Sequence, residues 1–420
     1  MSSALAPLQH RAFRYLAAGR LVVMLGNSIA PIALAFAVLD LTGSAADLGL
    51  VVGARSVMNV VFILFGGVVA DRLPRNLVLF VSCTVAAVSQ GVVATLVLTH
   101  TATIPALLGL SAVNGIASAF AFPAASALIA QTVPAELLRQ ANAINRLGTS
   151  AAMIAGAAAG GVLVAAVGPG WGLAIDAGTF AVAGALFRLV KVADYRAASD
   201  GPSSVLGDLR AGWAEVVART WVWVVVLAFG FINMAFVAAL SVLGPVVADT
   251  TFGRQWWGVV LAAEMAGMLV GALVAMRLRV RRLLLVGVAC CFGDAVFVFT
   301  LGTGLHLALL FLAAFIGGVA MEQFAIAWEV SIQEHIPADR LARVYSYDAL
   351  GSFIAIPLGQ VAAGPVADRA GVQPALFAAA AIIALSVVAM LASGEVRTLE
   401  HRPKRPESQG EESAALPVSA

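Results

Sequence analysis

The chain has 420 residues, of which 61% are hydrophobic and 11% are charged, with a formal net charge of +2. A soluble domain of ordinary composition carries about a quarter of its residues charged. This composition excludes a soluble enzyme, a disordered protein and a nucleic-acid binder with a basic surface, so no nucleic-acid partner is expected. It predicts instead an all-α protein that crosses the lipid bilayer many times.

Twelve apolar runs are long enough to cross a bilayer, because a membrane-spanning helix needs about 20 residues. The first run continues too far to be the core of a signal peptide, so it is predicted to be a span. The predicted spans are residues 13–39, 46–70, 77–99, 104–130, 140–166, 170–190, 221–247, 256–276, 283–302, 305–333, 341–367 and 372–392.

Lysines and arginines are concentrated in every second loop between the predicted spans, which places them on one side of the membrane. If the N-terminus is inside, the inner segments hold 20 of the 25 lysines and arginines, and the outer loops hold only Arg254 and Arg369. Cytoplasmic loops of membrane proteins carry such an excess of basic residues. We therefore expect both termini to be cytoplasmic.

The two halves of the chain resemble each other at an offset of about 203 residues. Residues 134–149 (PAELLRQANAINRLGT) follow the fourth span, and residues 337–352 (PADRLARVYSYDALGS) follow the tenth. Repeats of this kind indicate two structurally related halves. The predicted organisation is a six-helix bundle at 1–190, a cytoplasmic linker at 191–220 with an interfacial amphipathic helix, a second six-helix bundle at 221–394 and a disordered cytoplasmic tail at 395–420.

A short motif between the second and third spans carries a family resemblance. Residues 67–76 read GVVADRLPRN, which is similar to the G-x-L-A-D-R-x-G-R-K signature of the major facilitator superfamily. Segments such as 39–44 (LDLTGS) and 343–351 (RVYSYDALG) resemble its bacterial secretion and drug-efflux branch, which includes enterobactin exporters and macrolide efflux proteins. The resemblance implies the 6+6 major facilitator fold, in a bacterial cytoplasmic membrane.

The resemblance also assigns a gating role to the motif residues Gly67, Asp71, Arg72 and Arg75. In the family, the carboxylate that matches Asp71 contacts the start of the eleventh span and helps to close the inner gate. A carboxylate at a helix N-terminus is stabilised by the helix dipole, by enough to bias two conformers. The alternative is a fixed cap of the loop.

Ionisable residues inside the predicted spans are candidates for function, because their burial in lipid is costly. Glu322 and Glu329 lie two turns apart on one face of the tenth span and could couple transport to protons, or form a permanent ion pair with Arg146 or Arg20. Glu264 could attract a cationic substrate or pair with Arg55.

Further polar and soft apolar side chains could line a substrate cavity between the halves. Arg20 could also bind an anionic group, and it shares a helix face with Asn27 on the first span. Met and aromatic side chains suit varied ligands. The predicted cavity residues are Asn27, Asn233, Met234, Phe236 and Trp328.

The sequence therefore predicts a secondary active transporter that exports amphipathic small molecules, such as drugs or natural products, in exchange for protons. We expect a monomer with no cofactor and no metal site, because the five histidines are scattered and no nucleotide-binding loop is visible. Substrate and protons would be its partners, and the proton gradient its energy source. The alternatives are a dedicated siderophore or metabolite exporter, an uptake transporter, a membrane-embedded enzyme and a passive channel.

Overall fold

The structure is a computed structural model that describes residues 3–191, 216–278, 280–304, 306–337 and 340–401. Over these residues the chain is helical and forms no strand, and twelve helical segments are long and apolar enough to cross a membrane. The predicted all-α fold with twelve spans is confirmed.

Six spans make up the first half of the chain. They are α1 (Arg11–Thr42), α2 (Ala45–Arg72), α3 (Arg75–Leu98), α4 (Ile104–Leu128), α5 (Leu138–Val167) and α6 (Pro169–Arg188). Each agrees with its predicted span to within a few residues.

The second half repeats this pattern with breaks inside three of its spans. The seventh span joins α8 (Thr220–Ala238), one turn of π-helix η4 (Ala239–Leu243) and α9 (Gly244–Thr250), and the eighth is α10 (Arg254–Ala275). The ninth joins α11 (Leu283–Cys290) to α12 (Phe292–Thr303), and the tenth is α13 (Leu307–His335). The eleventh joins α14 (Leu341–Phe353) to α15 (Ile356–Ala370), and the twelfth is α16 (Val372–Ala392).

Small residues let the helices of one half approach closely. A Cβ atom at Gly66 of α2 would meet the backbone of Ala119 on α4, and one at Gly267 of α10 would meet the carbonyl of Phe315 on α13. Close backbone contact of this kind stabilises helix pairs in lipid, where no hydrophobic effect drives their association. The abundant glycines of the sequence therefore serve packing within each half.

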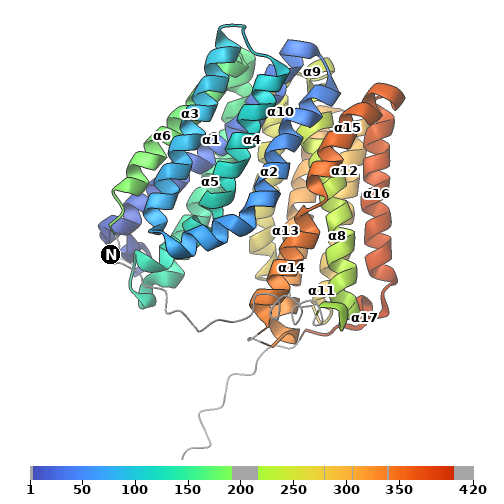
Figure 1. The fold of residues 1–420 in the computed structure, drawn as a ribbon. Coiled ribbons are helices and arrows are strands. Elements are labelled where there is room, and N and C mark those ends of the chain that lie inside the picture. Colours follow the sequence, from blue (N-terminus) through green and yellow to red (C-terminus); the bar gives the residue numbers. More distant parts are fainter. Residues whose placement is uncertain (1–2, 192–215, 279, 305, 338–339, 402–420) are drawn as a thin grey trace, which may run out of the picture.

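The two halves stand side by side and meet along only a few helices (Figure 1). Contacts between them run mainly through α5 with α10 and α2 with α15. The helices draw together at the end that holds the loop between α1 and α2, and they spread apart at the end where the chain begins (Figure 1). We call the first end the closed face and the second the terminal face.

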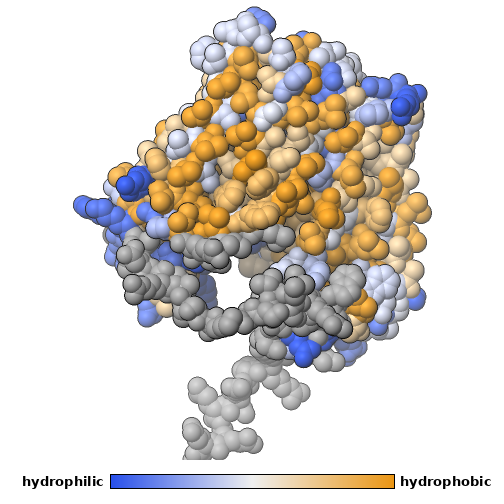
Figure 2. Space-filling view, in the orientation of Figure 1, coloured by the Kyte–Doolittle hydropathy of each residue, from blue (hydrophilic) through white to orange (hydrophobic). Residues whose placement is uncertain are grey.

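The sides of the molecule are apolar, and polar residues gather toward its two ends, as Figure 2 shows for one view. On α3, the exposed valines recur every three or four residues and form one stripe: Val81, Val85, Val88 and Val92. A regular apolar stripe facing outward is typical of a helix that contacts lipid.

Two predicted segments at the edges of the halves need comment. The amphipathic helix expected in the 191–220 linker lies mainly outside the described residues. The tail expected to be disordered from residue 395 begins with an ordered helix, α17 (Gly394–Thr398), whose Val396 is fully buried. The Glu395 carboxylate accepts a hydrogen bond from the backbone N–H of Trp221 at 2.9 Å, which fixes this helix to the start of α8.

Candidate functional site

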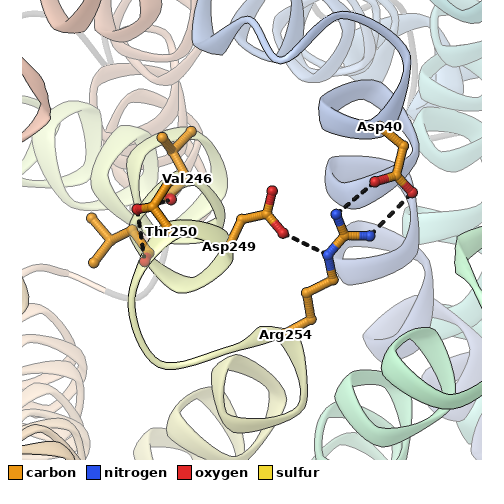
Figure 3. A network of polar contacts seen from close by, with 6 residues as sticks. Asp40, Val246, Asp249, Thr250 and Arg254 are labelled. Carbon is orange, nitrogen blue, oxygen red and sulfur yellow. Dashed lines mark hydrogen bonds and ion pairs between the residues drawn. The ribbon is translucent and has the colours of Figure 1, made fainter.

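Arg254 joins the two halves at the closed face (Figure 3). Its guanidinium donates two hydrogen bonds to the Asp40 carboxylate, at 2.5 and 3.1 Å, and a third to Asp249, at 2.6 Å. Asp40 belongs to the first half, and Arg254 and Asp249 to the second. The Arg254 guanidinium also lies 4.8 Å from the centre of the Phe36 ring on α1. We call Asp40, Asp249 and Arg254 the closed-face latch.

Each charge of the latch occupies the helix end where the dipole disfavours it. Asp40 is in the last turn of α1, Asp249 is in the last turn of α9, and Arg254 is the first residue of α10. Carboxylates are stabilised at helix N-termini and cations at C-termini, so all three positions are unfavourable in isolation. Asp249 and Arg254 compensate each other within the second half, whereas Asp40 is compensated only when the two halves meet.

A tight turn holds Asp40 at this face. Gly43 ends α1 with a φ of 66°, a left-handed conformation that suits glycine, and the Ser44 hydroxyl then accepts the backbone N–H of Asp47 at 3.2 Å to cap α2. Because α2 begins directly after this turn, both helices are fixed at the contact with the second half.

Below the latch, glycines bring the backbones of the two halves together. Added Cβ atoms at Gly161 of α5 and Gly258 of α10 would each come within 2.9 Å of the other glycine's backbone, and one at Gly364 of α15 would meet the backbone of Ala46. Backbone atoms cannot yield as flexible side chains do. The two halves therefore pack backbone against backbone at these points.

A cavity of about 380 Å³ lies between the halves, beneath these contacts. Its polar lining comes from both halves: Arg55, Ser56, Asn59 and Ser118 from the first, and Ser241 and Gln360 from the second. Its apolar lining includes Pro31, Leu34, Val52, Val60, Phe353 and Ile356. Ser241 belongs to the π-helical turn η4, a distortion that often accompanies functional positions.

A second ion pair joins the two halves, on the side of the cavity away from the closed-face latch. Arg146 on α5 contacts the Glu322 carboxylate on α13 at 3.3 Å. The side chain of Glu322 is 7% exposed, whereas that of Arg146 is 78% exposed. Arg146 was one of the two partners that the sequence suggested for Glu322, and the structure brings this pair together.

The other suggested partner of Glu322, Arg20, binds elsewhere. Its guanidinium donates to the backbone carbonyl of Ala125 on α4 at 2.9 Å, which ties two helices of the first half. Asn27, also on α1, has a buried side-chain oxygen with no hydrogen-bond partner among the described residues. It does not line the cavity described above.

Glu329 is separated from Glu322 in environment as well as in sequence. It is exposed, and its carboxylate accepts hydrogen bonds from Gln333 and from the Tyr345 hydroxyl, the latter at 2.7 Å. These contacts lie within the second half, so the two glutamates do not share a partner. Of the two, only Glu322 links the halves.

Glu264 does not pair with Arg55, and no ion pair between them is found among the described residues. It lies half-buried on α10 and interacts electrostatically with the buried Asp294 of α12. Its surroundings therefore belong to the interior of the second half.

The predicted cavity residues of the second half lie in packed or hydrogen-bonded positions. Trp328 is 8% exposed, packs on Trp221 and donates its indole N–H to Asp348 at 3.1 Å. Asn233 donates to the backbone of Ser352 at 2.9 Å, and Phe236 packs against Phe297. Met234 contacts Gly359 of α15. None of these four residues is in the described lining of the cavity above, so their role in a substrate cavity stays a prediction.

The gating motif lies at the terminal face, where α2 ends and α3 begins. Gly67, Asp71 and Arg72 fall within α2, but their side chains are outside what the structure describes, and Arg75 is the first residue of α3. The gating assignment therefore stays a prediction.

Comparison with known proteins identifies the family of this chain. The family described as the Major Facilitator Superfamily matches residues 16–359. This chain belongs to the major facilitator superfamily. It is a transporter rather than an enzyme, and its twelve candidate spans make it a multi-pass membrane protein.

Individual relatives agree with the superfamily assignment. The chain is 28% identical over 388 residues to the multidrug efflux pump Tap of Mycolicibacterium fortuitum, covering 87% of this chain and 91% of that protein. The crystal structure of the nucleoside transporter NupG superposes with a TM-score of 0.72 at 15% identity, over 91% of this chain and 98% of that one. A bacterial homologue of the human lysosomal transporter Spinster, in an inward-facing and unoccupied conformation, also gives 0.72, at 16% identity over 92% and 98%. These structures share the fold.

Sequence reasoning missed the latch and the polar lining of the cavity. Arg254 was counted only as one of two basic residues in the outer loops, and Asp40 only within a family-like segment. The helix dipole could have indicated the latch. Its carboxylates follow apolar runs and its arginine precedes one, and the dipole disfavours each charge at that end of the helix.

Proposed function

We propose that this transporter exports amphipathic small molecules from the cytoplasm in exchange for protons, by alternating access. The terminal face is the cytoplasmic one, as the basic loops indicate, and a single monomer contains both halves and needs no cofactor beyond the proton gradient. The similarity to a protein named as a multidrug efflux pump supports export of this substrate class.

The closed-face latch and the cavity support alternating access. The cavity receives residues from both halves, and the contacts above it join the halves at the closed face. Rocking of the halves about a central site is the usual mechanism of transporters built from repeats. In the conformation described here the closed face is latched and the helices spread at the terminal face, which resembles the inward-facing state named for the Spinster homologue.

The ion pair between Arg146 and Glu322 is the observation that carries proton coupling. One partner is buried and the other is exposed, so the pair can open by returning only Arg146 to water. An unpaired buried carboxylate is costly, and a buried carboxyl group that loses its cation binds a proton instead. A proton would then neutralise the Glu322 carboxylate in place of Arg146, and the two halves would no longer be joined by this ion pair.

The test compares Glu322→Gln with the wild type in proteoliposomes with an imposed pH gradient. The probes are the cationic dye ethidium and the zwitterionic dye rhodamine 110, and an internal pH indicator reports proton flux. We expect gradient-driven dye movement and its coupled proton flux to fall at least tenfold, while dye-for-dye exchange without a gradient persists. Exchange persists because it needs the cavity but no change in protonation.

Glu329→Gln is the matched control, since this carboxylate is exposed and bonded within its own half. It should keep gradient-driven transport. Full coupling in Glu322→Gln would exclude this residue as the proton site, and dye movement toward the cytoplasm would support the uptake alternative. Wild-type protein that moves neither dye would refute export of broad amphipathic substrates and favour a dedicated metabolite exporter.

A further inference from the structure

Arg55 places a guanidinium at the wall of the central cavity without a bonded partner. It lies on α2, well inside the membrane span. Within the described chain no hydrogen bond or ion pair reaches its side chain, although a guanidinium has five N–H donors. Arg55 is the one cationic residue in the described lining of this cavity.

The counter-charge that Arg55 senses is Asp176 on α6, and it does not fill this role at the cavity. Asp176 is 0% exposed and does not line the cavity. One of its oxygens accepts the side-chain N–H of Gln90 at 2.6 Å, and the other has no hydrogen-bond partner in the described part of the chain. Asp176 moderates the positive potential near Arg55, but no hydrogen bond or ion pair between the two is found among the described residues.

A cation in this position is costly for an empty transporter. Charged side chains inside membrane spans are rare, and they generally pair with another group or mark a transport path. Glu264, the partner that the sequence suggested, lies in the interior of the second half. Among the residues that the structure describes, the cavity lining includes no carboxylate. An anionic group on the substrate would supply the missing acceptor, and planar guanidinium binds carboxylate in a bidentate geometry.

A second unpartnered polar group lies across the cavity. Gln360 on α15 is 5% exposed, and its amide donates to Ser241 at 3.2 Å. Its side-chain oxygen is buried and accepts no hydrogen bond from any described residue. A buried acceptor without a donor costs free energy, and a ligand N–H or O–H group that reaches this oxygen on binding would remove that cost. It belongs to the other half from Arg55.

We propose that the central cavity selects zwitterionic or acidic amphipathic molecules: the carboxylate binds Arg55 in the first half, and an amine or hydroxyl donor binds Gln360 in the second. This inference rests on the proposed function, in which the cavity is the substrate site. The apolar body of the ligand lies against side chains such as Leu34, Phe353 and Ile356. A ligand held in this way joins the two halves through its own polar ends.

Rhodamine 110 and rhodamine 123 are a suitable probe pair, because the second is the methyl ester of the first and both carry the same amino donors. Binding to the detergent-purified full-length protein is measured by fluorescence anisotropy, so no gradient is needed. We expect rhodamine 110 to bind at least tenfold more tightly than rhodamine 123. Arg55→Gln should abolish this preference, and Arg55→Lys should retain part of it.

Two further variants separate the contributions of position and charge. Arg277→Gln removes a cation that is exposed at the end of α10 and away from the cavity, and it should leave both affinities unchanged. Gln360→Leu removes the acceptor that both dyes use, so it should weaken both by a similar factor.

The wild-type comparison tests the inference even if a variant does not fold. Equal binding of the two dyes, binding of neither, or an unchanged preference in Arg55→Gln would each overturn it. Failure of gradient-driven transport with an Arg55-dependent preference intact would refute the proposed proton-coupled export and leave the assignment of the cavity standing.

Discussion

The closed-face latch should control how often the transporter opens at that face. Replacing Asp40 with Asn removes the negative charge that Arg254 reaches across the halves while keeping a side chain of similar size. Arg254 keeps its bond to Asp249 within the second half, so the cation is not left unpaired. The substitution therefore isolates the contribution of the contact between the halves.

The expected magnitude follows from the geometry and exposure of the pair. A hydrogen bond to a charged group contributes about 1.5–3 kcal/mol when it is protected from water. The side chains of Arg254 and Asp40 are 24% and 44% exposed, so solvent screens the pair. Discounting for this exposure leaves about 1 kcal/mol, which corresponds to a roughly fivefold change in the ratio of closed to open molecules.

Spin labels at the closed face measure this ratio directly. Thr101 and His306 are exposed there, one in each half, and cysteines at these positions can carry the labels. Pulsed electron paramagnetic resonance in proteoliposomes should show a longer-distance population that grows about fivefold in Asp40→Asn. Raising the salt concentration should have a similar effect on the wild type, because salt screens exposed pairs.

Arg369→Gln is the matched control, since it removes an exposed cation from the same face without touching the latch. The combined variant Asp40→Asn with Arg254→Gln should be no more open than either single variant, because both changes remove one shared contact. A distance distribution that is the same in Asp40→Asn, Arg254→Gln and the wild type would refute the view that the latch stabilises the closed face.

Three other substitutions test the packing described above. Gly258→Val should open the closed face in the same spin-label experiment, because its Cβ would meet the backbone of Ala157 and Gly161, whereas Gly178→Ala, with nothing within 4 Å, should not. Trp328→Phe should lower the free energy of unfolding by about 1–2 kcal/mol, because its hydrogen bond to Asp348 is lost, and should leave the affinity for rhodamine 110 unchanged. A large loss of affinity would instead indicate that Trp328 lines the cavity. Glu395→Gln should weaken the cap on α8 by about 0.5–1 kcal/mol in denaturant unfolding, and Glu400→Gln should not; equal effects would argue against the cap.

The spans could be predicted closely because a single physical requirement decides them. Each must present about 20 apolar residues to lipid, and hydropathy records this directly. The twelfth predicted span, 372–392, coincides with α16, and the third, 77–99, differs from α3 by two residues or fewer at each end. Breaks inside spans, such as the π-helical turn η4, leave hydropathy unchanged and so were not predicted.

Site residues were harder to predict because hydropathy does not say which neighbour a side chain meets. Arg146 and Glu322 could be paired as candidates, since both are rare charges within spans, and the structure places them in contact. Trp328 and Phe236 could not be separated from cavity residues by sequence, because an aromatic side chain packs equally well against a neighbouring helix or a ligand.

The charges that matter most here are those whose local position is unfavourable. Asp40 and Arg254 each oppose a helix dipole, and Arg55 lies in a span without a bonded partner. Within one half, Arg254 pairs with Asp249 and Arg55 interacts electrostatically with Asp176, but Asp40 has no such partner and Arg55 forms no described hydrogen bond. Asp40 gains its partner from the other half of the transporter, and in our proposal Arg55 gains one from the substrate. A transporter must remain able to leave each of its states, and charges satisfied in only one state provide that reversibility.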